Sequence, residues 1–265
     1  MNCYKFLTFK QFCYNNNFKY INKNTSSSVD KIFILTLDTS KMRYKHIYQE
    51  IIKNDLYNTI IVVNTPYTRC KKTKNIKNSL NDILDANLQI YKYCLTNSLK
   101  NVLILEDDFE FDRKPNFNLI SNIIKKNKPD VLYLGHLPFF ILDRYENFNR
   151  VISLYGHSYI INNNAMKKIL SSKRLINRFN CLDEILAYKA LNFSLRCYAL
   201  KPQICFQKDF IDKRSNNTNS WDKFITNIPK NKLINLWEPL IDSFSFFIKY
   251  IIFFIIIFVI YKYIK

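Results

Sequence analysis

Short, continuous runs of apolar and β-branched residues recur along the chain. The four clearest runs cover residues 31–37, 59–63, 101–105 and 130–134. Runs of this length are typical of strands buried on both faces of a sheet. Between them lie segments whose apolar residues recur every three or four positions, the spacing of one helix face, at residues 44–52, 78–97 and 116–127. The alternation predicts an α/β fold with an open, mostly parallel sheet flanked by helices.

The chain divides into four predicted parts. Residues 1–29 form a basic, asparagine-rich extension without an acidic residue, and residues 30–210 form the α/β domain. The later half of this domain predicts further strands and helices, at residues 151–162, 163–171, 182–191, 194–200 and 203–207. Residues 211–242 are polar and indicate a linker, and residues 243–263 predict a transmembrane helix.

The predicted transmembrane helix rests on the sequence FSFFIKYIIFFIIIFVIY, residues 244–261, which only Lys249 interrupts. Eighteen helical residues span roughly 27 Å, close to the hydrocarbon core of a bilayer. The amino-terminal residues contain no apolar core of a signal peptide. We therefore expect a single-pass C-terminal anchor in a membrane, with the preceding domain in the cytosol. The alternative is a C-terminal helix buried in the protein core.

Composition removes several classes of protein. The chain has only 2 glycines, so neither glycine-rich phosphate-binding motif can be written. The formal charge of +19 favours polyanionic ligands, but an abundance of lysine together with asparagine and isoleucine weakens charge as evidence of function. The 7 cysteines include no CxxC pair, which argues against a zinc site or a disulfide framework and predicts free thiols.

An acidic cluster begins where the predicted strand 101–105 ends. It places five acids within seven positions, namely Glu106, Asp107, Asp108, Glu110 and Asp112. Ligands of open α/β sheets bind outside the carboxyl ends of strands, and packed carboxylates repel one another unless a cation lies among them. The cluster predicts a Mg²⁺ or Mn²⁺ site that also holds a phosphorylated ligand. The alternative is a solvated acidic turn.

These residues carry a resemblance to a known family. LEDD after an apolar strand resembles the acidic motif of GT-A type glycosyltransferases, and the order of motifs is similar to glycosyltransferase family 25, the lipopolysaccharide and procollagen galactosyltransferase group. The matching segments are KIFILTLDTSKMR (31–43), LILEDD (103–108), VLYLG (131–135), LYGHSYIINNNAMKKIL (154–170) and LDEIL (182–186). Helix 78–97 departs from the family because it lacks the Ser-His pair.

The resemblance implies a GT-A-like fold and a set of site residues. Asp108 would bind the metal, and Glu106 would bind the metal directly or through water, or would hold the ribose. Asp38, Arg43, Asp107 and Gln207 would contact the donor, a sugar nucleotide such as a UDP-sugar. For Arg43 the alternative is a surface arginine on a helix, and Asp107 could instead order the turn.

Asp183 is the candidate general base of an inverting transfer, because such a transfer needs a carboxylate to take the proton of the acceptor hydroxyl. The competing interpretation is a helix N-cap.

The sequence therefore predicts a metal-dependent glycosyltransferase that acts on a protein or glycan acceptor. A degenerate, non-catalytic GT-A-like binding protein is the alternative, favoured by the missing Ser-His pair. A metal-dependent nuclease fits the charge and the acids, but no lysine-based motif accompanies them, so we expect no nucleic-acid partner.

Overall fold

The computed structural model describes residues 14–19, 28–37, 41–56, 58–69, 76–208, 237, 239–248 and 251. The strands of this part are β1 Tyr14–Lys19, β2 Lys31–Leu37, β3 Thr59–Asn64, β4 Asn101–Glu106, β5 Phe109–Phe111, β6 Val131–Arg144, β7 Phe148–Asn162, β8 Cys197–Leu200 and β9 Cys205–Gln207. The labelled helices are α1 Lys41–Lys53, α2 Ser79–Thr96, α3 Phe117–Asn127, α4 Asn163–Leu170, α5 Lys173–Arg178 and α6 Leu182–Leu191.

The main sheet is mixed rather than mostly parallel. Its strand order is β1-β3-β2-β4-β7-β6-β8, and the pairs β2–β3, β2–β4 and β6–β8 are parallel. The long β7, however, lies between β4 and β6 and is antiparallel to both. Only residues 145–147 join β6 to β7, and so short a connection can link antiparallel strands but not parallel ones. The prediction of a mostly parallel sheet is therefore corrected.

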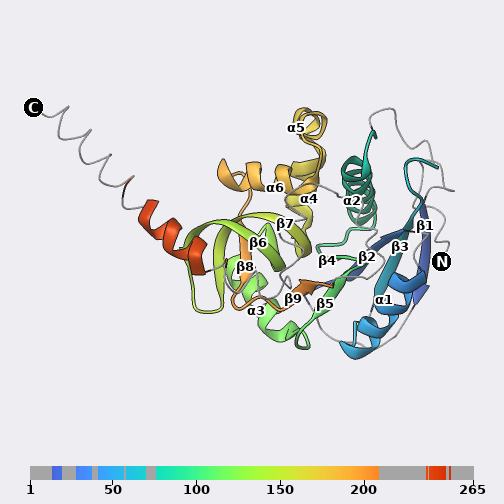
Figure 1. Ribbon diagram of the computed structural model, residues 1–265, viewed down its shortest axis with the longest axis horizontal. Coiled ribbons are helices and arrows are strands. Elements are labelled where there is room, and N and C mark those ends of the chain that lie inside the picture. The colour runs from blue at the N-terminus through green and yellow to red at the C-terminus, as the bar shows by residue number, and fades with distance from the viewer. Residues whose placement is uncertain are drawn as a thin grey trace, which may run out of the picture.

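Helices cover both faces of this sheet (Figure 1). Side chains alternate along a strand, so Phe33 of β2 packs in the core under α2, α4 and α6, whereas Ile32 and Ile34 pack in the core under α1 and α3. Burial on both faces explains why β2, β3 and β4 read as continuous apolar runs.

The edge strand β1 and the second sheet lie outside the parallel centre of the main sheet. Within the predicted extension, β1 pairs antiparallel with β3 at the edge. The short β5 follows the acidic turn and pairs antiparallel with β9 in a second, two-stranded sheet. Neither β1 nor β5 shows an apolar pattern long enough to be predicted from the sequence.

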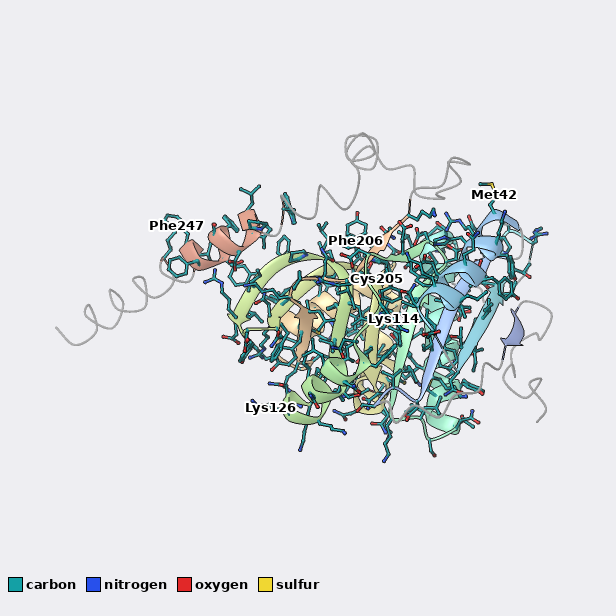
Figure 2. The ribbon with its side chains drawn as sticks, turned by 90° about the horizontal axis from the view of Figure 1, so that it is seen from below. Met42, Lys114, Lys126, Cys205, Phe206 and Phe247 are labelled. Carbon is teal, nitrogen blue, oxygen red and sulfur yellow. The ribbon has the colours of Figure 1, made fainter. Side chains whose placement is uncertain are left out.

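The residues around the start of the predicted membrane span pack against β6. Residues 239–248 form a helical segment in which Ile241 and Ser245 are buried. The hydroxyl of Ser245 accepts the Ile141 N–H at 3.0 Å, and Arg144 donates to the Asp242 carboxylate at 2.6 Å. Figure 2 shows Phe247 of this segment at the opposite end of the molecule from Met42 of α1.

The transmembrane prediction is corrected on this evidence. Among the helices of the described residues, none combines the length and the apolarity that a bilayer crossing requires. Residues 243–248 and 251 are the part of the predicted span that is described. This part makes a polar contact with β6 through Ser245, so its apolar side chains do not cover every side of the helix. The other residues of the predicted span lie outside the described part. The membrane-anchored fold class, the membrane as partner and the anchored location, with its cytosol-facing domain, therefore do not stand.

Candidate functional site

The acidic turn lies at the carboxyl end of β4, as predicted. Glu106 is the last residue of β4, Asp107 and Asp108 form the turn, and β5 begins at Phe109. Glu106 and Asp108 are half-buried, whereas Asp107 is only 7% exposed. Glu106 and Asp108 therefore share a partly solvated environment, and Asp107 is the one acid of the three that is withdrawn from water.

Asp107 is held by two groups from the amino-terminal part of the fold. Its carboxylate accepts a hydrogen bond of 2.9 Å from the Thr36 hydroxyl on β2, and it forms an ion pair with Arg43 on α1. Burial raises the pKa of Asp107, and the guanidinium of Arg43 opposes this rise. Arg43 is not a free surface residue, because its side chain is 18% exposed. Of the other predicted donor residues in this region, Asp38 lies outside the described residues.

One face of α1 continues this contact along the backbone of β5. His46 Nε2 donates to the Phe109 carbonyl at 2.7 Å, Glu50 accepts the Phe111 N–H at 3.1 Å, and Lys53 donates to the Phe111 carbonyl at 3.1 Å. With Arg43, these residues recur every three or four positions and so share one helix face. We call them the α1 polar face. They provide hydrogen-bond partners for backbone groups on the edge of β5 that does not pair with β9. Figure 1 shows α1 beside β5.

The sequence reasoning missed the α1 polar face. Its spacing was present in the sequence, but polar residues at helical spacing ordinarily face solvent. The burial of His46 and Glu50, each 4% exposed, depends on a strand more than fifty residues later in the chain. Only the tertiary fold reveals that contact.

β9 supports the turn from the other side. Gln207 is opposite Phe109 in the β5–β9 pair, and its amide nitrogen lies 3.4 Å from a carboxylate oxygen of Glu106. The next N–H along the chain, that of Lys208, donates to the Asp108 carbonyl at 2.6 Å. The fold thus brings the predicted donor residue Gln207 to the predicted metal ligand Glu106. Figure 2 shows Cys205 and Phe206 of β9 near the middle of the molecule.

A glycine allows β9 to come this close to the main sheet. A Cβ on Gly135 would lie 2.2 Å from the Cys205 carbonyl oxygen and 2.3 Å from His157 Nε2, which is not possible without movement of the backbone. His157 Nε2 itself donates to the Cys205 carbonyl at 3.2 Å. His136 lies 3.0 Å from the Ser153 hydroxyl, and burial lowers its pKa to about 3. Both histidines therefore have structural partners.

β7 carries a bulge of two extra residues beside the end of β4. Gly135 of β6 is opposite Ser158 and Leu137 is opposite Leu154, so the three β7 residues 155–157 face the single residue His136. Bulges of this kind bend a strand and redirect its backbone groups. Here they direct the N–H of Gly156 to the Asp183 carboxylate at 3.0 Å, and the N–H of Tyr155 also hydrogen-bonds to Asp183.

Asp183 is not the N-cap of α6. The cap position is Cys181, and Asp183 lies inside the first turn with its carboxylate bound to the β7 bulge. Burial raises the pKa of Asp183, and the two backbone N–H groups oppose this rise. The carboxylate is therefore oriented by β7 and partly withdrawn from water.

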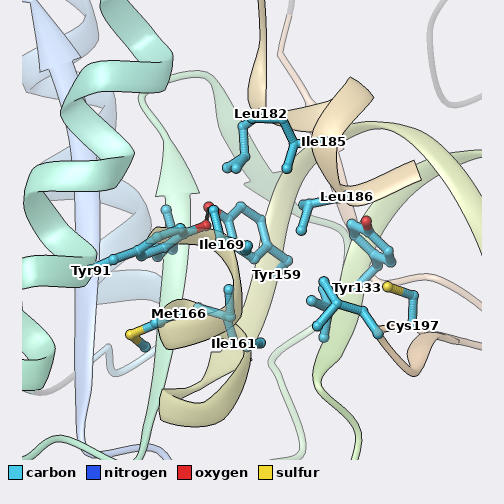
Figure 3. Close-up of a cluster of buried hydrophobic side chains, with 14 of the residues drawn as sticks. Tyr91, Tyr133, Tyr159, Ile161, Met166, Ile169, Leu182, Ile185, Leu186 and Cys197 are labelled. Carbon is cyan, nitrogen blue, oxygen red and sulfur yellow. Dashed lines mark hydrogen bonds between the residues drawn. The ribbon is translucent and has the colours of Figure 1, made fainter. Parts of the chain in front are cut away.

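Three buried tyrosines lie close enough to Asp183 for its charge to raise their pKa values, although burial is the main cause. The hydroxyls of Tyr91 and Tyr159 are 2.9 Å apart, and that of Tyr159 donates to Asn87 of α2 at 2.7 Å. Figure 3 shows Tyr91, Tyr133 and Tyr159 among apolar residues of α4 and α6. These phenols stay neutral, and the hydrogen bonds among Tyr91, Tyr159 and Asn87 join α2 to β7.

The acidic turn and Asp183 lie at the same end of the sheet. Leu105 of β4 is opposite Ser158 of β7, and the two strands are antiparallel. Glu106, which comes after Leu105, and the bulge, which comes before Ser158, therefore lie at the same end of the sheet. The fold thus brings Arg43, Glu106, Asp107, Asp108 and Gln207 together, and it holds Asp183 of α6 against the bulge of the neighbouring strand β7. Among the described residues, no three His, Cys, Asp or Glu side chains converge as a ready metal site.

Comparisons with known proteins give a fold-level likeness only. No protein-family model matches the chain, and no curated protein sequence matches it. A solved structure titled A197 from STIV aligns with 71% of this chain and all of its own, at 12% identity and a TM-score of 0.39. A glycosyltransferase involved in glycosylation of the major capsid of PBCV-1 aligns with 64% of this chain and 80% of its own, at 14% identity and a TM-score of 0.39.

The apo structure of a UDP-glucose pyrophosphorylase also aligns, over 64% of this chain and 72% of its own, at 11% identity and a TM-score of 0.36. The structural neighbours thus include a glycosyltransferase and a sugar nucleotidyltransferase. At these TM-scores the function of the chain has to be argued from its own residues, and membership of glycosyltransferase family 25 stays a prediction.

Proposed function

We propose that the chain is a metal-dependent glycosyltransferase that moves a sugar from a nucleotide diphosphate to a hydroxyl acceptor with inversion at the sugar carbon. The observation that carries this proposal is the presence of two kinds of carboxylate at one end of the sheet. Glu106 and Asp108 are half-buried at the end of β4, and Asp183 in the first turn of α6 is oriented by the bulge of the neighbouring strand β7. The first pair suits a cation with a diphosphate, and the single carboxylate suits proton removal.

The acidic turn fits a cation that is shared with the donor. Mg²⁺ is commonly held by one or two carboxylates together with substrate phosphates, so a complete set of protein ligands is not required. Asp108 and Glu106 would hold Mn²⁺ or Mg²⁺, whose charge would offset the charge that develops on the departing diphosphate.

The donor contacts would come from the residues around this turn. Arg43 forms an ion pair with Asp107 beside the proposed cation ligands, and its positive charge suits the phosphates of a sugar nucleotide, for example a UDP-sugar. Asp107 would act by holding Arg43. Gln207 is next to Glu106 and would contact the donor sugar.

In the proposed transfer step, the acceptor oxygen bonds to the sugar carbon while the bond from that carbon to the diphosphate oxygen breaks. The electron pair leaves with the diphosphate, and the hydroxyl proton passes to the Asp183 carboxylate. Such general-base help is typically worth about 10²–10⁴-fold in rate.

The test is donor binding measured by thermal shift with UDP-glucose, UDP-galactose, UDP-N-acetylglucosamine and GDP-mannose, each with and without Mn²⁺. A ligand at 100 times its Kd stabilises the native state by about 2.7 kcal/mol. We expect Asp108→Asn to weaken the best donor about tenfold, or ~1.4 kcal/mol, while the protein stays folded.

The matched control is Asp143→Asn, because Asp143 is a half-exposed β6 carboxylate 3.5 Å from Arg150, eight positions along the strand from Gly135. It makes the same change of charge and should bind the donor normally. Equal Mn²⁺-dependent binding by the Asp108 variant would remove the metal site. Donor binding without transfer to any acceptor would favour the non-catalytic alternative.

A further inference from the structure

Tyr155 has a left-handed backbone conformation, which is unusual for a residue inside a strand. Six described residues other than glycine have a positive φ, and five of them lie in turns or next to helix ends, namely Asp55, Asn58, Ser98, Lys128 and Phe193. Left-handed residues are common where a helix ends. Tyr155, with a φ of 62°, instead lies inside β7. A bulky side chain in this region is a genuine outlier.

The conformation serves Asp183. It lets the successive N–H groups of Tyr155 and Gly156 turn towards one carboxylate, which a regular strand cannot do because its N–H groups alternate in direction. A left-handed residue costs about 1–2 kcal/mol, and glycine would avoid most of that cost. The backbone task therefore does not explain why an aromatic residue stands at position 155.

The side chain of Tyr155 is also exposed. Its residue is 50% exposed, whereas Tyr133 and Tyr159 nearby are buried in the core. The bulge places Tyr155 at the end of the sheet that carries the acidic turn, and its backbone contacts the carboxylate proposed as the base. Strained residues of this kind cluster at ligand sites, and small-molecule sites combine aromatic surface with a few oriented polar groups.

We propose that the β7 bulge is the acceptor subsite of the transferase and that the acceptor is a sugar. The ring of Tyr155 would pack against the apolar C–H face of the acceptor sugar, while one hydroxyl of that sugar reaches Asp183. A tyrosine suits this role because it joins a rigid apolar face to a polar tip. This inference rests on the proposed function, but it assigns a different residue, a different subsite and a class of acceptor.

The experiment compares Tyr155→Asn and Tyr155→Phe with the native protein. Asparagine tolerates the left-handed conformation, so Tyr155→Asn removes the ring without adding backbone strain. Its melting temperature should be unchanged or higher. Acceptor binding is measured by saturation-transfer NMR with the methyl glycosides of glucose, galactose and mannose. At least one glycoside should bind the native protein and Tyr155→Phe, and its affinity for Tyr155→Asn should fall about tenfold or more.

Phe193→Asn is the matched control. Phe193 is also an exposed aromatic residue with a positive φ, 65% exposed, but it follows the far end of α6 and packs under Arg150. This variant should bind the glycosides normally. Absence of binding to the native protein, or equal binding to Tyr155→Asn, would overturn the acceptor subsite. The sugar-nucleotide thermal shift is independent of this result, so a failed subsite with intact donor binding leaves the proposed transferase standing.

Discussion

At the scale of single residues, burial changes the pKa of the Asp183 carboxylate that we propose as the general base. Burial raises its pKa, so over the interval between the ordinary aspartate pKa and the raised value the folded protein binds more protons than the unfolded chain. The contribution of Asp183 to stability therefore falls as the pH rises through this interval. The charged form needed for proton removal is thus the form that the fold tolerates less well.

Two results follow for Asp183. Transfer should increase with pH through a pKa above that of an ordinary aspartate, as measured by kcat/KM against pH.

Asp183→Asn keeps an oxygen that can accept the Gly156 N–H but cannot take a proton. We expect its transfer rate to fall about a hundredfold or more, with donor binding retained and the melting temperature equal or higher.

The control for this variant is Glu184→Gln, which removes the neighbouring charge on the same turn of α6. Glu184 accepts the Asn180 N–H at 3.0 Å, and glutamine can do the same. Its transfer rate should stay close to native. Near-native transfer by Asp183→Asn would remove Asp183 as the base.

At the scale of secondary-structure elements, α1 positions the acidic turn through its polar face. Glu50 is 4% exposed and accepts hydrogen bonds from the Phe111 N–H and the Asn54 amide. Glu50→Ala would leave buried donors without an acceptor, which costs about 1–3 kcal/mol for each such group. It would also loosen β5, which directly follows Asp108.

We expect Glu50→Ala to lower the melting temperature and to weaken Mn²⁺-dependent donor binding by about tenfold, or ~1.4 kcal/mol. Glu50→Gln keeps the acceptor oxygen and should recover most of the donor affinity. If Glu50→Ala lost stability but bound the donor normally, α1 would support the fold without positioning the turn.

The same scale shows what sequence patterns can and cannot predict. β2 and α6 were predicted with the bounds observed. Each is buried in the core, and the apolar pattern that results from burial lies within a few consecutive residues of the sequence. The acidic turn was also found, since it directly follows β4. The β7 bulge, the α1 polar face and the pairing of β7 with β4 were not predictable, because each depends on contacts between residues far apart in the chain.

At the scale of the whole molecule, the segment 239–248 belongs to the folded unit rather than to a separate span. Trp237 donates its indole N–H to the Pro138 carbonyl at 3.0 Å, and Arg144 bonds both the carboxylate and the backbone carbonyl of Asp242. Ser245 is 1% exposed and provides the acceptor for the Ile141 N–H. Of these residues, Ser245 lies inside the predicted membrane span, and together with Trp237 and Asp242 it identifies the face that packs on β6.

This docking predicts a stability effect that a detached segment would not produce. Ser245→Ala removes the acceptor of a buried backbone N–H, so the free energy of unfolding should fall by about 1–3 kcal/mol in urea titrations. Ser243→Ala makes the same substitution two residues away at an exposed position and should change it by less than about 0.5 kcal/mol. Equal stability of the two variants would mean that residues 239–248 contribute nothing to the fold through Ser245, and the edge of β6 would then need another partner.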